Sequence, residues 1–143
     1  MTEITLARQD DVAAISRLLT EDGLPIDGLS DHLATALVAR DAGRVVGAAG
    51  LEVYPEGGLL RSVVIDREFR GTGLGRQLVE AVTGLARARQ LPALYLLTTT
   101  AAGYFPRLGF IAISRDEVPA SVQQSVEFTS ACPASAAAMM KRL

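Results

Sequence analysis

Apolar residues recur with two different periods along the chain, and the period distinguishes expected helices from expected strands. Residues 3–6 alternate as a short strand. A helix follows, in which Asp10 and Asp11 can provide N-cap oxygens and which Gly23 and Pro25 end. Its apolar stripe consists of Val12, Ile15, Leu18 and Leu19. The pattern therefore predicts a strand followed by an amphipathic helix.

The next part of the chain predicts a short helix and then three consecutive strands. The strands are expected at residues 36–40, 44–54 and 59–65, with glycine-containing turns between them. Gly47 and Gly50 interrupt the second of these strands, which indicates a bulge or a close backbone approach. The third strand is rich in β-branched residues, so we expect it to lie in the buried centre of the sheet.

A second long helix and two further strands are expected in the C-terminal half. Leucine and valine recur every three or four residues from Leu74 to about residue 89. Strands are expected at residues 94–99 and 110–114, with a short helix at about 102–108 between them. Strands joined both by hairpins and by helices imply a mixed sheet, in an α/β or α+β architecture.

The end of the chain leaves two interpretations open. Residues 119–130 are polar and irregular, whereas residues 136–143 are rich in alanine and methionine. That composition favours a helix by propensity. A last strand beside residues 110–114 would instead close the sheet.

The length is typical of one small domain, residues 1–143, and the composition argues against several classes of function. A net charge of −2 argues against nucleic-acid binding, because counterion release needs a surplus of cations. We expect no membrane segment and a cytoplasmic location, since no apolar run approaches about 20 residues and no signal core is present. The single Cys132 and the single His32 leave no ligands for a Cys- or His-based metal site.

One local feature departs from this average: a glycine-rich, basic loop directly after the central strand. It contains Arg70, Gly71, Thr72, Gly73, Leu74, Gly75 and Arg76. Amides in such a turn, together with a helix N-terminus, attract phosphate groups, and arginines add donors. A Walker loop is excluded because Arg76 and Gln77 stand where Lys and Ser/Thr are required, and the dinucleotide spacing fits poorly. An ordinary glycine-rich turn is the alternative.

The spacing Arg-x-x-Gly-x-Gly after an apolar strand resembles the acetyl-CoA loop of the GCN5-related N-acetyltransferases (GNAT). Residues 101–110 resemble the family's last helix and Gly-Phe strand entry, and residues 138–143 resemble its closing strand. The resemblance implies a mixed, splayed sheet of six or seven strands flanked by about four helices. It also implies acetyl-CoA as co-substrate. The implied cofactor-binding positions are Val63, Val64, Ile65, Arg70, Gly71, Thr72, Gly73, Leu74, Gly75 and Arg76.

Further segments narrow the resemblance. Residues 97–101, Tyr104 with Phe105, and Val118 with Pro119 are similar to N-acetylglutamate-synthase-like members, which acetylate amino acids. With residues 132–136 the chain looks most like small acetyltransferases of bacterial arsenic-resistance operons. The implied acceptor is a small amino-acid-like amine, either glutamate-like or an arsenic- or phosphorus-containing analogue.

Two residues are candidates for proton transfer in such a reaction. Glu52 could act as a base or water relay, or it could be a solvated carboxylate on its strand. The family commonly has a tyrosine at the position of Phe105, and here Tyr104 lies one residue earlier. In one interpretation Tyr104 protonates the leaving thiolate. In the other, water protonates the thiolate, and Tyr104 packs against its neighbours or contacts the cofactor.

An amino-acid substrate also calls for a cation to bind its carboxylate. Arg61, beside Ser62 on the cofactor strand, is the candidate, because a charge inside an apolar strand needs a partner. Arg115 and His32 are more simply explained as surface residues, and Cys132 as a buried thiol.

Three functions remain after these arguments. The first is acetyl transfer to a small amino-acid-like amine. The second is acetylation of protein or peptide N-termini, and the third is a catalytically weak acetyl-CoA sensor, suggested by Phe105. We expect a monomer or a homodimer.

Overall fold

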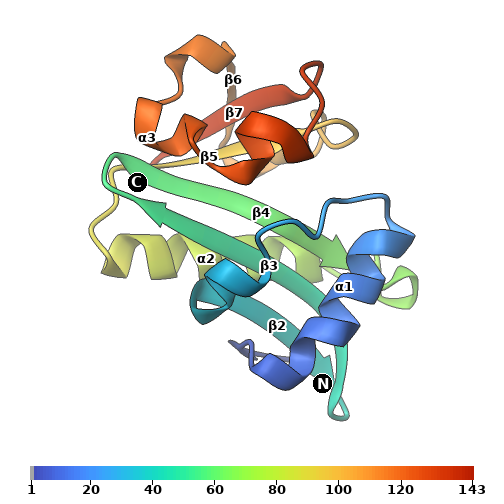
Figure 1. Ribbon diagram of the computed structural model, residues 1–143. Coiled ribbons are helices and arrows are strands. Elements are labelled where there is room, and N and C mark those ends of the chain that lie inside the picture. Colours follow the sequence, from blue (N-terminus) through green and yellow to red (C-terminus); the bar gives the residue numbers. More distant parts are fainter. Residues whose placement is uncertain (1) are drawn as a thin grey trace.

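A seven-stranded mixed sheet, in the order β1-β2-β3-β4-β5-β7-β6, forms the centre of the computed structural model, which describes residues 2–143. Figure 1 shows α1 on one side of this sheet and α2 on the other. The strands are β1 (Thr2–Leu6), β2 (Ala36–Asp41), β3 (Arg44–Tyr54), β4 (Gly57–Ile65), β5 (Ala93–Thr98), β6 (Ile111–Ile113) and β7 (Ala137–Arg142). The expected mixed sheet of six or seven strands is confirmed, and it has seven.

Three α-helices accompany the sheet: α1 (Val12–Glu21), α2 (Leu74–Ala88) and the short α3 (Ala120–Gln123). The expected boundaries of α1 and α2 agree with the structure to within about two residues. The predicted N-cap role of the Asp11 carboxylate is wrong, because its oxygens instead accept hydrogen bonds from Arg40 (2.9 and 2.6 Å) and from the Arg8 amide (2.7 Å). This buried ion pair fastens the start of α1 to β2.

The remaining helical segments are short, with six residues or fewer. They are η1 (Gln9–Asp11), η2 (Ser30–Thr35), η3 (Arg67–Phe69), η4 (Phe105–Leu108), η5 (Arg115–Glu117) and the π-helical η6 (Glu127–Ala131). The helix expected at about 102–108 is therefore shorter than predicted, and it ends at Gly109 in the left-handed conformation (φ 96°). The α3 and η6 turns fall almost entirely within residues 119–130, which the sequence describes as irregular with at most one helical turn.

The central feature of the sheet is a splay between β4 and β5. These parallel strands pair only at Gly58 with Leu94 and at Leu59 with Tyr95. Figure 1 shows the two strands separating beyond that point. On its other side β4 continues to pair with β3 as far as Ile65. The divergence opens a wedge in an otherwise continuous sheet.

A β-bulge lies beside the splay. Gly50 pairs with Arg61 and Ala48 with Val64, so β4 carries one extra residue between these two pairs. The bulge contains Ser62, whose φ of 58° is unusual for a residue other than glycine. The irregularity expected from Gly50 is thus confirmed.

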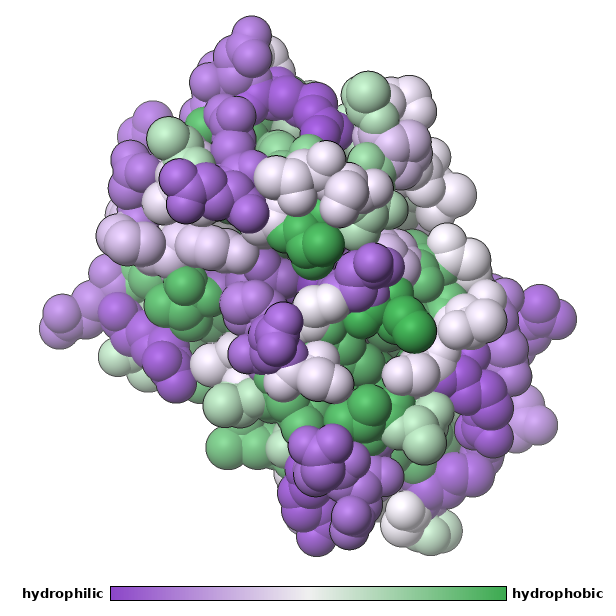
Figure 2. Space-filling view, viewed as in Figure 1, coloured by the Kyte–Doolittle hydropathy of each residue, from purple (hydrophilic) through white to green (hydrophobic). Residues whose placement is uncertain are grey.

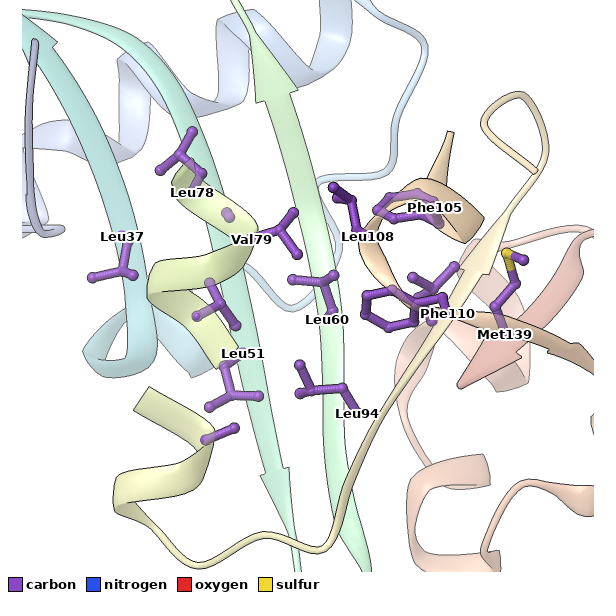
Figure 3. Packing of buried hydrophobic residues seen from close by; sticks show 14 of the residues in the cluster. Leu37, Leu51, Leu60, Leu78, Val79, Leu94, Phe105, Leu108, Phe110 and Met139 are labelled. Atoms are coloured by element: carbon purple, nitrogen blue, oxygen red, sulfur yellow. The ribbon is translucent and has the colours of Figure 1, made fainter. Parts of the chain in front are cut away.

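Alternating residues of the strands divide the core between the two faces. Leu51, Leu60 and Leu94 point toward Leu78 and Val79 of α2 (Figure 3). On the opposite face a second cluster unites α1 with its neighbours on the sheet, Val38, Val45, Ala48 and Val64. A third cluster joins the 118–128 segment to β5 and β7. Each face of the sheet is therefore covered by its own apolar layer.

The C-terminal segment is a strand, which decides between the two interpretations left open by its sequence. β7 pairs antiparallel with β5 along six residue pairs and with β6 along three. The backbone hydrogen bonds on both sides outweigh the helix propensity of alanine and methionine, which is worth only tenths of a kcal/mol per residue.

The face seen in Figure 2 carries hydrophobic residues in its middle and hydrophilic residues toward its edges. None of the helices within residues 2–143 has the length and apolar character needed to cross a membrane.

Packing of α2 against the sheet is expected to set much of the stability. Leu78 is fully buried, so Leu78→Ala is expected to lower the free energy of unfolding by about 2–5 kcal/mol. Gly84→Ala on the exposed side of the same helix is expected to raise it by about 0.5–1 kcal/mol, because a Cβ there meets no other atom. Urea denaturation of both variants measures the two effects. A Leu78→Ala protein with the same free energy of unfolding as the wild type would contradict this account of the core.

Candidate active site

A cavity of about 690 Å³ lies in the wedge between β4 and β5. Its floor is formed by residues 60–65 of β4 and residues 96–98 of β5. One end lies at the glycine-rich loop and the start of α2, and the segment that contains η6 contributes Glu127 and Cys132. The splay therefore joins the predicted anion-binding loop to side chains that are distant in the sequence.

The glycine-rich loop has the geometry that anion binding requires. Gly71 and Gly73 have φ values of 78° and 85°, and a Cβ at either position would meet no atom within 4 Å. Gly73 is the N-cap of α2, and no side chain caps the helix there. Open space thus faces a helix N-terminus whose first amides have no side-chain partner, an arrangement suited to a phosphate group.

Arginines lie around this loop. Arg70 forms an ion pair with Asp22 of 2.9 Å, and Arg76 lies 3.9 Å from Glu80. Arg107, which the sequence analysis did not single out, also lines the cavity from η4. Only the fold brings Arg107 to the loop, because about thirty residues separate them in the chain. All three cations remain accessible to an anionic ligand.

One edge of β4 is available for backbone hydrogen bonding. Within residues 2–143, β4 and β5 show no backbone pairing beyond Leu59, whereas Val63, Val64 and Ile65 line the cavity. An extended, amide-bearing chain can therefore lie along this edge as an additional strand would. Residues 63–65 are also strand positions at which the family resemblance implies cofactor binding.

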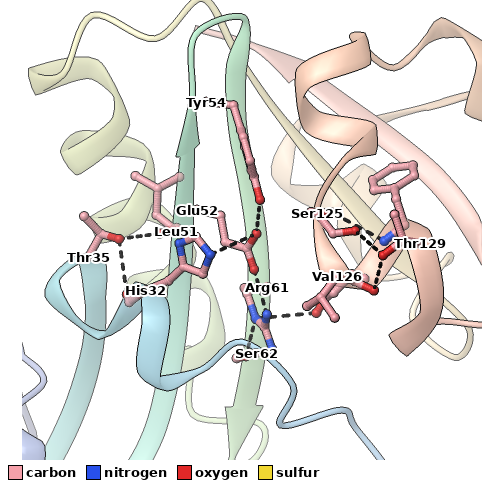
Figure 4. Close-up of polar contacts among 12 residues, drawn as sticks. His32, Thr35, Leu51, Glu52, Tyr54, Arg61, Ser62, Ser125, Val126 and Thr129 are labelled. Atoms are coloured by element: carbon pink, nitrogen blue, oxygen red, sulfur yellow. Dashed lines mark hydrogen bonds and ion pairs between the residues drawn. The ribbon is translucent and has the colours of Figure 1, made fainter.

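A buried network of charged and polar side chains lies behind the cavity floor (Figure 4). Glu52 is fully buried, and its Oε2 accepts a hydrogen bond of 2.7 Å from Arg61 Nη1. Its Oε1 accepts a hydrogen bond from the Tyr54 hydroxyl and lies 3.4 Å from His32 Nε2. Glu52 is therefore not the solvated carboxylate that the sequence left as an alternative, and it does not line the cavity. Burial and the Glu52 carboxylate raise the pKa of Tyr54 above its usual value.

Arg61 and Ser62 connect this network to the cavity. Arg61 Nε donates to Ser62 Oγ at 3.1 Å and lies 3.5 Å from Glu127 Oε2. The Nη2 nitrogen is buried and has no hydrogen-bond acceptor within the described part of the chain. Because Arg61 also lines the cavity, one donor of a buried guanidinium remains for a ligand.

The sequence analysis missed Glu127, which is buried and lines the same cavity. Burial raises its pKa to about 7, although the nearby Arg61 acts in the opposite direction. Burial also raises the pKa of Cys132 to about 11, so that thiol stays protonated at neutral pH. Glu127 has no local signal, because its role depends on a π-helical turn and on a partner 66 residues earlier.

Tyr104 and Phe105 have different environments. Phe105 is buried against Phe110, with ring centroids 5.7 Å apart. Tyr104 is 37% exposed, and its hydroxyl would lie 2.7 Å from a Cβ at Gly75, in the first turn of α2. The phenol therefore lies at the phosphate end of the cavity, a position that favours cofactor contact.

The two residues interpreted as surface charges have structural partners. His32 is partly exposed and contacts Glu52, as described above. Arg115 stacks over the Phe128 ring at 5.1 Å and donates to the carbonyls of Phe128, Pro133 and Ala136. Arg115 therefore fastens the segment that carries Glu127. Among residues 2–143 no group of three or more His, Cys, Asp or Glu side chains is arranged to hold a metal ion.

Comparison with known proteins agrees with this geometry. Residues 32–112, more than half of the chain, match the Acetyltransferase (GNAT) domain family. An uncharacterized N-acetyltransferase, CT2212, from Chlorobaculum tepidum is 29% identical over 125 residues, covering 81% of this chain and 79% of that protein. An amino-acid acetyltransferase from Ralstonia nicotianae is 31% identical over 124 residues. The match covers 79% of this chain but only 27% of that relative.

Solved structures show the same fold. N-acetylglutamate synthase from Neisseria gonorrhoeae, complexed with coenzyme A and N-acetyl-glutamate, superimposes with a TM-score of 0.86 at 22% identity, covering all of this chain and 35% of that one. Rv2747 from Mycobacterium tuberculosis, in complex with CoA, gives a TM-score of 0.83 at 26% identity and covers 99% of both chains. The chain belongs to the GNAT family of N-acetyltransferases.

Proposed function

We propose that the protein transfers the acetyl group of acetyl-CoA to the amine of a small amino acid. The observation that carries the acceptor class is that Arg61 lines the cavity and that its buried Nη2 has no hydrogen-bond acceptor among residues 2–143. A buried guanidinium donor without an acceptor is costly, and a substrate carboxylate supplies the charged acceptor that it lacks.

Glu52 keeps Arg61 in place for this task. Its 2.7 Å contact uses one terminal nitrogen of the guanidinium and leaves the other for the ligand. The Gly28 backbone covers the pair so closely that a Cβ would lie 2.9 Å from Arg61 Nη1. We therefore assign Glu52 to positioning Arg61, because its carboxylate is already engaged and does not reach the cavity.

The glycine-rich loop supports acetyl-CoA as the donor. The open faces of Gly71 and Gly73 and the uncapped start of α2 would hold the pyrophosphate, with Arg70 and Arg76 beside it. The free edge of β4 at residues 63–65 would receive the pantetheine arm. Acetyl-CoA supplies an acyl group on a thiol leaving group, which an amine can displace.

The relatives support the same acceptor class. Several are named amino-acid acetyltransferases, and this chain spans only about a quarter of their length. A free amino acid presents an ammonium group whose pKa lies above the value of about 7.7–8.0 for a peptide N-terminus, because its own carboxylate stabilises the positive charge. Acetyl transfer to such an acceptor therefore needs a group in the site that accepts a proton from the ammonium.

A panel of acceptors tests the proposal through release of free thiol from acetyl-CoA. It should contain glutamate and related amino acids, analogues with an arsenic- or phosphorus-containing acid group, a peptide N-terminus and simple amines. Turnover of amino acids above simple amines supports the proposal. Preference for the peptide, or tight CoA binding without any turnover, would contradict it in favour of a protein acetyltransferase or a sensor.

Gly73→Ala is expected to weaken acetyl-CoA binding by at least tenfold. The new Cβ strains a backbone with positive φ and occupies the open space where a phosphate would lie. Gly43→Ala is a matched control, because Gly43 has a φ of 81° with the same open surroundings but lies in the hairpin between β2 and β3. Calorimetric titration with acetyl-CoA measures both, and equal affinities of the two variants would refute the loop assignment.

Arg61→Lys is expected to raise KM for the best amino acid by about 10–100-fold, the value of a charge-assisted hydrogen bond of about 1.5–3 kcal/mol. The lysine keeps a positive charge beside Glu52 and Glu127 but removes the Nη2 donor. The matching amino alcohol, which lacks the carboxylate, is expected to react equally well with both proteins. A similar loss on both substrates would show that Arg61 does not recognise the carboxylate.

A further inference from the structure

We propose that Glu127 binds the ammonium group of the acceptor and takes a proton from it before acetyl transfer. This inference rests on the proposed function and assigns a catalytic residue to it. The carboxylate lies in the wall of the cavity beside Arg61, so one substrate could reach both groups, Arg61 through its carboxylate and Glu127 through its amine.

Local structure fixes Glu127 in this position. It begins the π-helical turn η6, whose first carbonyl accepts a hydrogen bond of 3.1 Å from the Cys132 amide. Ser125 closes the start of the turn, since its carbonyl accepts from Thr129 Oγ1 at 3.0 Å. Single π-turns are uncommon and occur frequently at functional sites, because the wider turn redirects one side chain.

The two buried glutamates differ in what they can still bind. Glu52 is engaged by Arg61, Tyr54 and His32 and does not line the cavity. Glu127 lines the cavity, and its ion pair with Arg61 Nε is a longer contact of 3.5 Å. Its carboxylate therefore keeps acceptor capacity toward a ligand.

The charges around Glu127 also favour a cationic ligand. Arg61 faces two carboxylates, Glu52 and Glu127, so this buried group carries a net negative charge when both are ionised. The Cys132 thiol, which also contacts Glu127, stays neutral because burial raises its pKa to about 11. A bound ammonium ion would neutralise the second carboxylate, because one guanidinium neutralises only one of the two.

Burial raises the pKa of Glu127 to about 7, so its carboxylate is a stronger base than that of an ordinary glutamate and is still ionised in part at neutral pH. The ammonium group of a free amino acid has a pKa above the value of about 7.7–8.0 for a peptide N-terminus, and the raised pKa of Glu127 narrows the difference between the two groups. Glu127 first takes one proton from the ammonium, and the freed nitrogen forms a bond to the acetyl carbon as the carbon–sulfur bond breaks. A second nitrogen proton passes to the sulfur. The products are an acetamide, a free thiol and the one proton that Glu127 then releases to solvent.

Glu127→Gln is expected to lower kcat/KM for the amino acid about 100-fold or more at pH 7, because the amide cannot accept the proton. The pH profile provides a more specific signature. In the wild type, activity rises as the Glu127 carboxyl ionises near pH 7. In the variant it should rise only as the ammonium group of the free amino acid loses its own proton, well above about pH 8. The deficit should therefore shrink steadily as the pH is raised beyond about 9.

Two controls separate this inference from the proposed function. Acetyl-CoA affinity should be unchanged in Glu127→Gln, and Glu127→Asp should recover part of the activity because it keeps a carboxylate. If the wild type acetylates amino acids and the variant retains both the rate and the pH profile, Glu127 is not the base. If the wild type acetylates no amino acid although it binds acetyl-CoA, the proposed function itself fails.

Thermal unfolding gives a readout independent of activity. The folded protein holds the Glu127 proton up to about pH 7, whereas an unfolded glutamate releases it near about pH 4.3. The contribution of Glu127 to the free energy of unfolding therefore falls as the pH rises from about 4.3 to about 7. Glu127→Gln should melt several degrees above the wild type at pH 8 and close to it at pH 5. The exposed Glu21→Gln should show no such pH dependence, and a Glu127→Gln curve like that control would contradict a buried, titrating carboxylate.

Discussion

Backbone pairing between β4 and β5 stops after Leu59, and the cavity exists because of that interruption. A parallel pair that continued would have used the hydrogen-bonding edge of residues 63–65 and closed the wedge. β3 holds β4 on one side, and β7 holds β5 on the other, so each strand remains ordered without its partner. The sheet can therefore be open at its centre and still have a continuous core on both faces.

The same interruption explains why charge can be buried at the site. The bulge at Ser62 adds one residue to β4 just where the strands part, beside Arg61. Arg61, which lines the cavity, is buried between Glu52 of β3 and Glu127 of η6, and its Nη2 has no acceptor within residues 2–143. Two carboxylates and one guanidinium leave this buried group with a net negative charge when both carboxylates are ionised, which is costly to the fold.

The two ends of the cavity thus offer different groups for binding a ligand. At the loop, backbone amides, glycines with positive φ and partly exposed arginines suit a phosphate that stays hydrated on one side. At the Arg61 end, side chains with almost no exposure suit a small ligand that is stripped of water. Tyr104 lies with the first group, close to Gly75, whereas Phe105 is a buried core residue that packs against Phe110.

The sequence by itself determined the elements and the loop. The periods of apolar residues located α1, α2 and the strands, and the glycine spacing identified the family, because these signals lie within short stretches of chain. Only the tertiary structure decided the rest. Residues 137–142 are a strand because β5 and β6 pair with them, and Glu52 is buried because Arg61 and Tyr54 lie beside it. Glu127 enters the site through contacts across more than sixty residues, and no local pattern records the energy of a contact between distant segments.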